Sequence, residues 1–559
     1  MSLINSTAIP SGASAYEIDQ SLRFNSPDSS YLTRTISSDS NRRTYTISLW
    51  AKRGNLGTSM QLMGARSGST FTLMYFSGHY INFYSMASGN EYQATTSAVY
   101  RDTSAWYSIV VAVDTTQGTQ SNRVKMYVNG VQQTLQSSNY PENFDTSINS
   151  TIAQQIGRQS TGADHYDGYL AEVNFVDGQA LTPTSFGETG TYGEWKPIAY
   201  SGTYGTNGFY LDFSNSGALG TDSSGNSNTW TVNNLAATDQ MVDSPTNNFA
   251  TWNALSYDGG TAMTEGNLNA YGSGGTSANE GGTATIGVTS GKWYWENRIK
   301  AVGSSCAIGI FPSNNNPKAI ADMFQGNPSI YYKQDGNKHV NDSSSSYGSS
   351  YTTGDIIGVA LNLDDNEIKF YKNNTVQNSG TAIAVTSTSE YYNPVQAGTG
   401  SSQVTANFGS DSSFAGAATA QGNQDGNSIG DFYYAPPSGF LALCTSNLPD
   451  VAVIPSEHFN TVIYTLSGGS YPKSVTGVGF QPDLIWQKSR TQNYGHYLFD
   501  VIRGVGTASL ASNSTGVEGA DTGTDLDSFD ADGLTVGAGD SFGDTSGVVW
   551  NWKANGSGA

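Results

Sequence analysis

Apolar and polar residues alternate in short stretches of this chain, and turn-forming residues separate the stretches. In "VKMYV", Val124, Met126 and Val128 share one face, whereas Lys125 and Tyr127 share the other. A period of two with one apolar face is typical of a half-buried antiparallel strand. Many such stretches between Gly, Asn and Ser clusters predict an all-β protein made of tandem antiparallel β-sandwiches.

Two of these stretches turn back on themselves in nearly the same way. In "VKMYVNGVQ", Asn129 and Gly130 supply the positive φ angles of a tight hairpin turn. In "EIKFYKNNTVQ" (367–377), Asn373 and Asn374 stand at the same places. The Lys, aromatic and amide side chains of this second stretch would also suit a polar ligand. We interpret it as scaffold, because its apolar residues alternate as in a strand.

The composition supports a folded protein with several domains. Aromatic residues make up 12% of the 559 residues, including 33 Tyr, and a disordered chain lacks such a content. A chain of this length also exceeds what one hydrophobic core usually serves. The pattern predicts five segments: an N-terminal arm (1–15), a first sandwich (16–187), an ordered connector (188–250), a second sandwich (251–447) and a small C-terminal sandwich (455–559).

The charge and the apolar runs exclude some classes of partner. The net charge of −21 argues against nucleic acid and against anionic membranes, since both attract Lys and Arg. No apolar run reaches the ~18 residues of a membrane helix, so we expect no membrane insertion. The start, "MSLINSTAIPSG", lacks the basic and apolar regions of a signal peptide, which predicts synthesis in a cytoplasm. Cys306 and Cys444 lie in strand-like runs, where we expect buried free thiols rather than a bridge.

The first sandwich resembles a known superfamily. The residues that carry the resemblance are "WYSIVVAVD", "NRVKMYVNGVQ" and "DGYLAEVNFVDGQALTPTSFG". In order and spacing they are similar to the laminin-G and concanavalin-A-like lectin and glucanase superfamily, whose fold is a jelly-roll sandwich. The resemblance implies paired strands and a closing strand followed by a short helical turn.

The second sandwich resembles another family. "GKWYWENRI", "CAIGIF" and "GDIIGVALNLDDNEIKFYKNN" are similar in order and spacing to the SPRY domain. The resemblance implies a second β-sandwich, in which the strand that ends in "NLDD" is followed directly by its antiparallel neighbour.

The C-terminal segment and the order of the units resemble phage proteins. "GVGFQPDLIW", "HYLFDVIRGV", "SFDADGLTVG" and "VVWNWKA" are spaced as in a module found in virion proteins of phages. The order of lectin-like unit, SPRY-like unit and this module is similar as well. The resemblance implies a virion structural or host-attachment protein, made in the host cytoplasm and localised in the virion.

Sequence patterns for catalysis are weak. Lectin-fold glucanases carry a Glu-x-Asp-x-x-Glu pattern, which sets carboxylates on one strand face as nucleophile and acid/base. This chain lacks the pattern, because Glu172 and Asp177 of "AEVNFVD" fall on opposite faces of a strand. "GNSIG" (426–430) matches the Gly-x-Ser-x-Gly of a nucleophile elbow, but its loop-like flanks favour a chance match. We therefore expect that the chain is not an enzyme.

Acidic loops are the candidates for cation binding. Hard cations such as Ca²⁺ bind several carboxylate oxygens. "DTGTDLDSFDADG" gathers five of them, at Asp521, Asp525, Asp527, Asp530 and Asp532. "DHYDG" (164–168) is a smaller cluster. Neither follows a specific Ca²⁺ motif and the His residues lack paired metal spacing, so solvated turns are the favoured interpretation and no cofactor is expected.

The best candidate for a ligand site lies in the second sandwich. "SIYYKQDGNKHVNDSSSSYGSSYTTGD" (329–355) combines aromatic rings with amide and hydroxyl side chains, as a glycan site requires. The candidate glycan-binding residues are Tyr331, Tyr332, Tyr347 and Tyr351. The alternative is that some of these Tyr belong to the core and the rest to a polar loop.

Three functions fit the sequence. The first is a phage virion protein, a tail-fibre or appendage subunit whose partners are other virion proteins and host surface glycans. Within this first function, a non-adhesive head or tail decoration protein is the alternative. The second function is a polysaccharide-degrading enzyme and the third a bacterial surface adhesin; the missing carboxylate pattern and the missing signal peptide argue against them. Fibres are often trimers, so the resemblance implies a homo-oligomer, although the sequence has no heptad pattern.

Overall fold

The computed structural model describes residues 16–554 with several gaps. The gaps are 257–261, 272–279, 304, 313–328, 342, 387–391, 400, 450–453, 466–470, 506–507, 516–518, 521–524 and 538–545. The expected N-terminal arm (1–15) lies outside the described residues. The described chain separates into two compact units, the first formed by nearly all residues up to Pro449 and the second chiefly by those after it.

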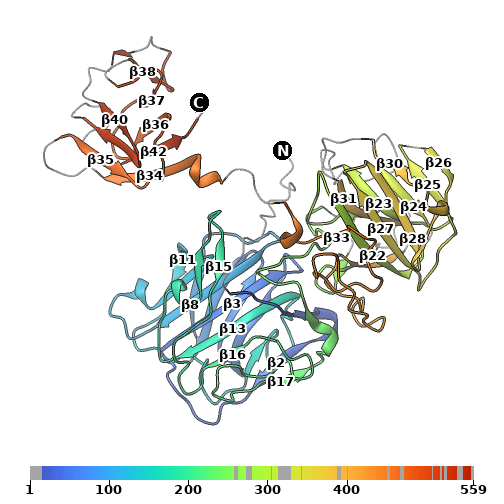
Figure 1. Cartoon of the computed structure of the whole chain (residues 1–559). Coiled ribbons are helices and arrows are strands. Elements are labelled where there is room, and N and C mark those ends of the chain that lie inside the picture. The colour runs from blue at the N-terminus through green and yellow to red at the C-terminus, as the bar shows by residue number, and fades with distance from the viewer. Residues whose placement is uncertain are drawn as a thin grey trace. The chain divides into compact units, whose positions relative to one another are not determined.

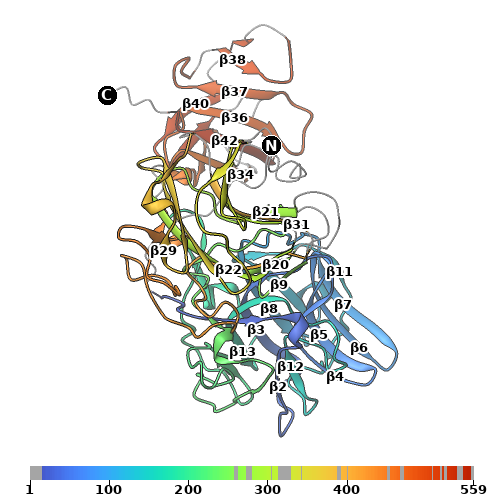
Figure 2. The same ribbon diagram turned by 90° about the vertical axis from the view of Figure 1, so that its right-hand side faces the viewer.

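The first sandwich of the first unit consists of two eight-stranded antiparallel sheets (Figure 1). One sheet has the order β10 (Val131–Gln132), β9 (Val124–Val128), β8 (Trp106–Asp114), β3 (Thr44–Arg53), β13 (Gly168–Asp177), β1 (Ser21–Phe24) and β18 (Gln240–Met241), with β16 (Phe209–Leu211) also paired to β13. The other has the order β11 (Leu135–Ser138), β7 (Asn90–Thr96), β6 (Tyr80–Ala87), β5 (Thr70–Ser77), β4 (Met60–Ser67), β12 (Gln154–Ile156), β2 (Tyr31–Arg34) and β17 (Thr231–Asn233). In Figure 2, β4 to β7 lie side by side as hairpins.

The core of this sandwich lies between the two sheets, and alternation decides which side chains enter it. Val124, Met126 and Val128 of β9 are buried there, as their spacing predicts. In β13, Leu170 and Phe175 face the same core. Apolar side chains of this kind stabilise a fold by roughly 1.5–3 kcal/mol each when fully buried.

The two similar turns are hairpin scaffold. Asn129 and Asn373 both have φ 47, and the residues that follow them also have positive φ. Each Asn side chain also accepts a bond from a backbone N–H near the start of the neighbouring strand: Ser108 N to Asn129 Oδ1 is 2.9 Å and Ile356 N to Asn373 Oδ1 is 2.8 Å. Asn suits this position because it tolerates the left-handed region and bonds to nearby backbone.

The connector (188–250) adds three strands to the first sandwich. β16 pairs with β13, β17 with β2 and β18 with β1. Phe209, Leu211 and Trp230 of this segment are buried in the same core as β13. A short hairpin of β14 (Gly187–Thr189) and β15 (Trp195–Pro197) precedes these strands.

The second sandwich of the first unit is also formed by two sheets. One has the order β19 (Ala262–Thr264), β20 (Asn269–Tyr271), β32 (Gln403–Asn407), β22 (Lys292–Ala301), β27 (Ile356–Asn362), β28 (Glu367–Lys372) and β29 (Thr375–Val376), with β30 (Ile383–Ala384) on β28 and β33 (Leu441–Ala442) parallel to β22. The other has the order β21 (Glu280–Thr283), β31 (Tyr392–Thr399), β23 (Ser305–Pro312), β24 (Ile330–Lys333), β25 (Asn337–Val340) and β26 (Ser343–Ser346).

Apolar and charged contacts join the two sandwiches within this unit. Trp50, Trp106 and Tyr169, on the face of their sheet that points away from the first core, belong to one hydrophobic cluster with Trp252 and Leu268. The first sandwich also contributes a buried Arg23, which binds Asp239 of the connector at 3.1 Å and Asp411 of the second sandwich at 2.9 Å. The connector therefore does not separate two independent bodies.

The C-terminal unit has two sheets around a small core. The larger has the order β34 (Phe459–Thr465), β42 (Ser546–Trp552), β36 (Leu484–Ser489), β37 (His496–Asp500), β38 (Ala508–Ala511) and β39 (Gly519–Ala520). The smaller has β35 (Lys473–Thr476), β41 (Gly533–Val536) and β40 (Leu526–Asp530). Trp550 and Trp552 lie half-buried on the face opposite this core, and Trp550 packs on Trp486 with ring centroids 5.0 Å apart.

Helical residues of the described chain form short 3-10 turns. They are Ser26–Asp28, Gln120–Asn122, Pro183–Ser185, Ala237–Asp239, Asn378–Gly380, Thr445–Asn447 and Pro455–Glu457. The turn Pro183–Ser185 follows the closing strand β13, where the resemblance of the first sandwich implied a helical turn. No helix of the described residues is long and apolar enough to cross a membrane. The predicted all-β class of antiparallel sandwiches is confirmed.

Candidate functional site

The four candidate tyrosines are buried in the second sandwich, and Tyr332, Tyr347 and Tyr351 belong to its core, which corrects the surface site expected from the sequence. Tyr331 and Tyr332 are fully buried in β24, between β23 and β25, and Tyr347 and Tyr351 are at most 5% exposed. The Tyr351 hydroxyl donates to the backbone oxygens of Cys306 (2.9 Å) and Tyr332 (3.0 Å). Rings packed in this way offer no face to a glycan, because the neighbouring strands cover them.

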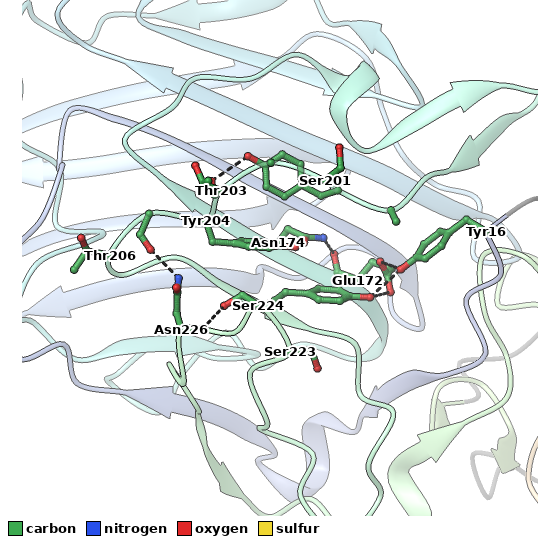
Figure 3. Close-up of a pocket in the computed structure, with 15 residues that line it drawn as sticks. Tyr16, Glu172, Asn174, Ser201, Thr203, Tyr204, Thr206, Ser223, Ser224 and Asn226 are labelled. Carbon is green, nitrogen blue, oxygen red and sulfur yellow. Dashed lines mark hydrogen bonds between the residues drawn. The ribbon is translucent and has the colours of Figure 1, made fainter.

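A cavity of about 800 Å³ lies on the first sandwich instead (Figure 3). Tyr16, just before β1, and Tyr210 of β16 contribute to its lining. Glu172 of β13 is the one acidic side chain among the described lining residues. The loops 199–206 and 223–226 supply the rest of the lining, chiefly Ser, Thr, Gly and Tyr. We call this cavity the Glu172 pocket.

A β-bulge places Glu172 in the pocket. In β13, Ala171 pairs with Trp50 and Asn174 with Ser48, so that two residues of β13 oppose one of β3. Glu172 is the bulged residue, with φ 52. The opposite edge of β13 changes partner at the same point, from β1 to β16. Bulges often redirect a side chain next to a functional site, and this one directs a carboxylate toward the cavity.

Two tyrosine hydroxyls hold the Glu172 carboxylate. Tyr16 donates to Oε2 at 2.8 Å and Tyr210 to Oε1 at 2.5 Å, and the two hydroxyl oxygens lie 2.9 Å apart. Burial raises the pKa of Glu172 to about 7; the two hydroxyl bonds oppose this shift and the charge of Asp212 adds to it. Burial also raises the pKa of Tyr210, so both tyrosines stay neutral donors.

Further aromatic and amide groups form the side walls. The Tyr204 hydroxyl donates to Asn174 Oδ1 at 2.7 Å, which fixes its ring over the sheet. The rings of Tyr200 and Tyr204 meet at 77° with centroids 5.0 Å apart, and those of Tyr204 and Tyr210 are nearly parallel at 6.3 Å. Each of these three rings is half-buried, and the exposed parts of the rings line the cavity.

Backbone contacts fix the loops around the pocket. Gly205 has φ +74, and a Cβ there would lie 2.4 Å from the backbone oxygen of Asp177, so only glycine fits. Asn226 Nδ2 donates to the backbone oxygens of Gly205 (2.7 Å) and Gly208 (2.9 Å). The 199–206 loop is therefore held against β13 before any ligand enters.

The pocket holds no pair of carboxylates for sugar hydrolysis among its described residues. Asp177 points elsewhere: its oxygens accept bonds from Asn149 Nδ2 at 2.6 Å and from the Asn207 backbone at 3.1 Å. Glu172 and Asp177 thus lie on different sides of β13, as their spacing predicts. A lone carboxylate can bind or polarise a ligand, but the two-carboxylate mechanism of glycosidases needs a partner.

The other chemical candidates do not assemble into sites in the described part of the chain. Cys306 and Cys444 are buried and free. Ser428 of "GNSIG" lies in an exposed turn rather than between a strand and a helix. No group of three His, Cys, Asp or Glu side chains is placed to hold a metal among the described residues. Asp521 of the acidic loop lies outside them.

The sequence contained one local sign of this pocket. "LAEVNFV" interrupts an otherwise apolar closing strand with Glu172 and Asn174. A carboxylate and an amide inside a buried strand are unusual unless they have a function or hydrogen-bond partners. The bulge, and the partners Tyr16 and Tyr210 from distant parts of the chain, have no comparable local sign.

Family models match three parts of the chain. Residues 26–186 match the "Concanavalin A-like lectin/glucanases superfamily" and residues 292–411 match the "SPRY domain". Residues 454–559 match a "Domain of unknown function (DUF7483)". No curated protein matches the chain.

Solved structures similar to the chain include two SPRY domains and stonustoxin. The SPRY domain of human HERC1 is 19% identical with a TM-score of 0.23, and the match covers 27% of this chain and 96% of that one. Stonustoxin is 17% identical with a TM-score of 0.23, and the match covers 28% of this chain and 27% of the toxin chain. A human SPRY domain is 17% identical with a TM-score of 0.20, covering 25% of this chain and 89% of that one.

The match to the lectin superfamily ends at residue 186, so the loops 199–206 and 223–226 of the Glu172 pocket lie beyond it. The pocket is thus built on the lectin-like sandwich but completed by other residues of this chain. The first sandwich is similar to concanavalin-A-like lectins and glucanases and the second to SPRY domains, and together these similarities indicate a binding or adhesion role.

Proposed function

We propose that this chain is a phage virion protein, a subunit of a tail fibre or surface appendage, that binds a saccharide of the host surface through the Glu172 pocket. The observation that carries the binding role is the pocket itself: a cavity of about 800 Å³ on a lectin-like sandwich, lined by tyrosine rings, hydroxyls and amides. Cavities of this size are typical of small-molecule sites.

The chemistry of the lining suits a sugar. Ser, Thr and Asn side chains offer both donors and acceptors, which a ring of hydroxyl groups needs. The rings of Tyr200, Tyr204 and Tyr210 offer apolar surface for sugar C–H groups. Tyr204 is held by Asn174, so less rotamer freedom is lost when a ligand binds.

The virion role is supported by the order of the units. A lectin-like sandwich, a SPRY-like sandwich and the C-terminal module follow one another as in phage virion proteins. Such a protein would work as a homo-oligomer beside other virion proteins. The alternative is a non-adhesive decoration protein of the head or tail.

Binding to host cells by the purified chain tests the attachment role. We expect labelled protein to bind susceptible cells and to block infection in competition. The Tyr204→Ala variant should lose at least about tenfold in affinity, whereas Tyr204→Phe, which keeps the ring, should lose less. Tyr80→Ala is the matched control, because Tyr80 lies on β6 of the same sandwich, outside the pocket lining.

Two outcomes contradict parts of the proposal. If wild type binds cells and Tyr204→Ala binds equally well, attachment does not use this pocket. If wild type neither binds cells nor blocks infection, the decoration role replaces the attachment role. A virion reconstruction that lacks the chain would overturn both.

A further inference from the structure

Among the residues that the structure describes, no positively charged group balances the Glu172 carboxylate in the pocket. Glu172 is 8% exposed, and the bonds that its carboxylate accepts come from the neutral hydroxyls of Tyr16 and Tyr210. The charged group that acts on it is Asp212, another carboxylate. The described pocket lining contains no Lys, Arg or His. A buried carboxylate of this kind is costly unless a cation pairs with it.

The aromatic rings around the carboxylate suit a particular kind of cation. An ammonium group is attracted to the face of a tyrosine ring within about 6 Å of its centroid. Tyr200 and Tyr204 meet at 77°, and Tyr210 lies parallel to Tyr204, so ring faces and edges border the cavity from more than one direction. Figure 3 shows the Tyr16 ring pointing toward the Glu172 carboxylate. Recognition of ammonium groups by such aromatic walls is a known principle of binding sites.

We propose that the Glu172 pocket selects a ligand that carries a positively charged ammonium group. The proposal rests on the proposed saccharide-binding function and names its ligand class: an amino sugar with a free amine, or a saccharide that bears a quaternary ammonium substituent. The ammonium group sits against Glu172, and the tyrosine rings contact its carbon-bound hydrogens.

Other ligand charges fit this pocket less well. A hard metal ion needs several oxygen ligands, of which some are charged carboxylates, whereas the described pocket lining supplies one carboxylate. An anionic sugar would be repelled by Glu172 and Asp212. A neutral sugar would bring no charge to pair with the carboxylate. It would also displace the water that hydrates the carboxylate in the open cavity. An ammonium group balances the negative charge of Glu172, and the bonds from the tyrosine hydroxyls to the carboxylate stay in place.

The carboxylate has acceptor capacity left for such a ligand. An ionised carboxylate offers about four lone-pair sites, and Tyr16 and Tyr210 occupy one on each oxygen. A charge-assisted bond from an N–H group to either oxygen is stronger than a neutral one. A quaternary ammonium lacks N–H groups and would use the rings and the charge alone.

The ionisation of Glu172 gives the proposal a pH dependence. Burial raises the pKa of Glu172 to about 7, so much of the carboxyl is protonated in mildly acidic solution. The titratable groups that face it are Tyr16, Tyr204, Tyr210 and Asp212. Burial raises the pKa of the three tyrosines, which stay neutral near pH 7. The affinity for a permanently charged ligand should therefore rise by about tenfold between pH 5.5 and about pH 8.

Calorimetric titration of the full chain with matched ligands tests the proposal. One pair is choline and its neutral isostere 3,3-dimethyl-1-butanol, and the other is a glucosamine oligosaccharide and the same oligosaccharide N-acetylated. We expect the charged member of at least one pair to bind about tenfold more tightly than its neutral partner. Preferential binding of choline would indicate a quaternary ammonium ligand, and preferential binding of the glucosamine oligosaccharide would indicate a free amine.

Variants of the full chain link the effect to the site. Glu172→Gln should lower the affinity for the charged ligand by about tenfold and abolish its pH dependence. Tyr210→Phe, which keeps the ring, should have a smaller effect. Glu188→Gln is the control: Glu188 is exposed on β14 and lies outside the lining. Thermal unfolding of each variant shows whether it is folded.

The outcomes separate this inference from the function on which it rests. If the N-acetylated oligosaccharide binds and neither charged member is preferred, the pocket is a neutral-saccharide site and the ammonium proposal is wrong. If a charged ligand binds a folded Glu172→Gln variant as tightly as wild type, the carboxylate does not select it and the proposal is also wrong. If none of the four ligands binds, both the saccharide function and the ammonium proposal fail for this pocket.

Discussion

Replacing Arg23 should destabilise the first unit strongly, because this residue joins its two sandwiches through charge. Arg23 is 1% exposed and contacts Asp411 at 2.9 Å, Asp239 at 3.1 Å and Glu265 at 3.6 Å. Burial alone would lower the pKa of Arg23, but these three carboxylates overcome that effect and raise it. The guanidinium therefore stays charged in the folded protein.

The size of the effect follows from what the substitution leaves behind. Arg23→Met keeps much of the side-chain volume but leaves three carboxylates close together, and the Asp411 side chain is only 4% exposed. Removing one partner of a buried ion pair costs about 3–5 kcal/mol. Asp239 and Glu265 are 17% and 15% exposed and can turn toward water. We therefore expect the lower half of this range, about 3–4 kcal/mol.

Hydrogen exchange of the full chain, read by mass spectrometry, measures this change locally. The free energy of opening of β1 and β13 should fall in Arg23→Met, and the C-terminal unit should be unaffected. Arg43→Met is the matched control, because Arg43 and Asp145 form an exposed ion pair, and surface pairs contribute little. We expect no measurable change in this control.

The pH dependence gives a second check on the same reasoning. Burial raises the pKa of Glu265 above its ordinary value of 4.5, and Arg23 opposes this shift. Without Arg23 the pKa of Glu265 should rise further, so that acid neutralises it and relieves the repulsion. The loss of stability in Arg23→Met should be largest near pH 8 and smaller near about pH 5. A loss below about 1 kcal/mol at pH 8, or one that grows in acid, would refute the charge network as the link.

Three further substitutions test other parts of the structure. Glu172→Gln should become more stable than wild type as the pH rises from about 5 to about 8, because a carboxyl whose folded pKa is raised to about 7 loses stability on ionisation; melting temperatures over this range that stay equal would contradict the burial of Glu172. Gly168→Ala should cost about 2 kcal/mol or more, since its Cβ would lie 2.1 Å from the Lys52 backbone oxygen at φ +135, whereas Gly118→Ala, in open space, should be neutral in urea unfolding. Asn129→Ala should cost about 1–2 kcal/mol through the strained φ and the lost bond to Ser108, and an unchanged unfolding midpoint would count against that turn as scaffold.

Local patterns were sufficient to predict strands and turns. The face shared by Val124, Met126 and Val128 depends only on the two-residue period, and these residues are buried in the core as expected. The hairpin turns at Asn129 and Asn373 depend on the φ preferences of single residues. Both are properties of a few neighbouring residues, which is why the sequence alone reveals them.

The position of the site depends on contacts that no local pattern reveals. Tyr332 and Tyr351 read as a polar aromatic loop, but neighbouring strands and rings enclose them. The pocket, in contrast, combines Tyr16, Glu172 and Tyr210, whose separations along the chain are 156 and 38 residues. The bulge at Glu172 arises where β13 changes partner from β1 to β16, and this depends on the register of the whole sheet.

The strands that the connector adds also set an order for synthesis of the protein. A ribosome releases β1 and β2 early, but their partners β18 and β17 are not made until the chain has reached residue 241. Until then β1 and β2 are the edge strands of their sheets, and an unpaired edge is the part of a nascent chain most prone to pair with another chain. Folding of the lectin-like sandwich therefore finishes only once translation has passed the loops that line the pocket, residues 199–206 and 223–226.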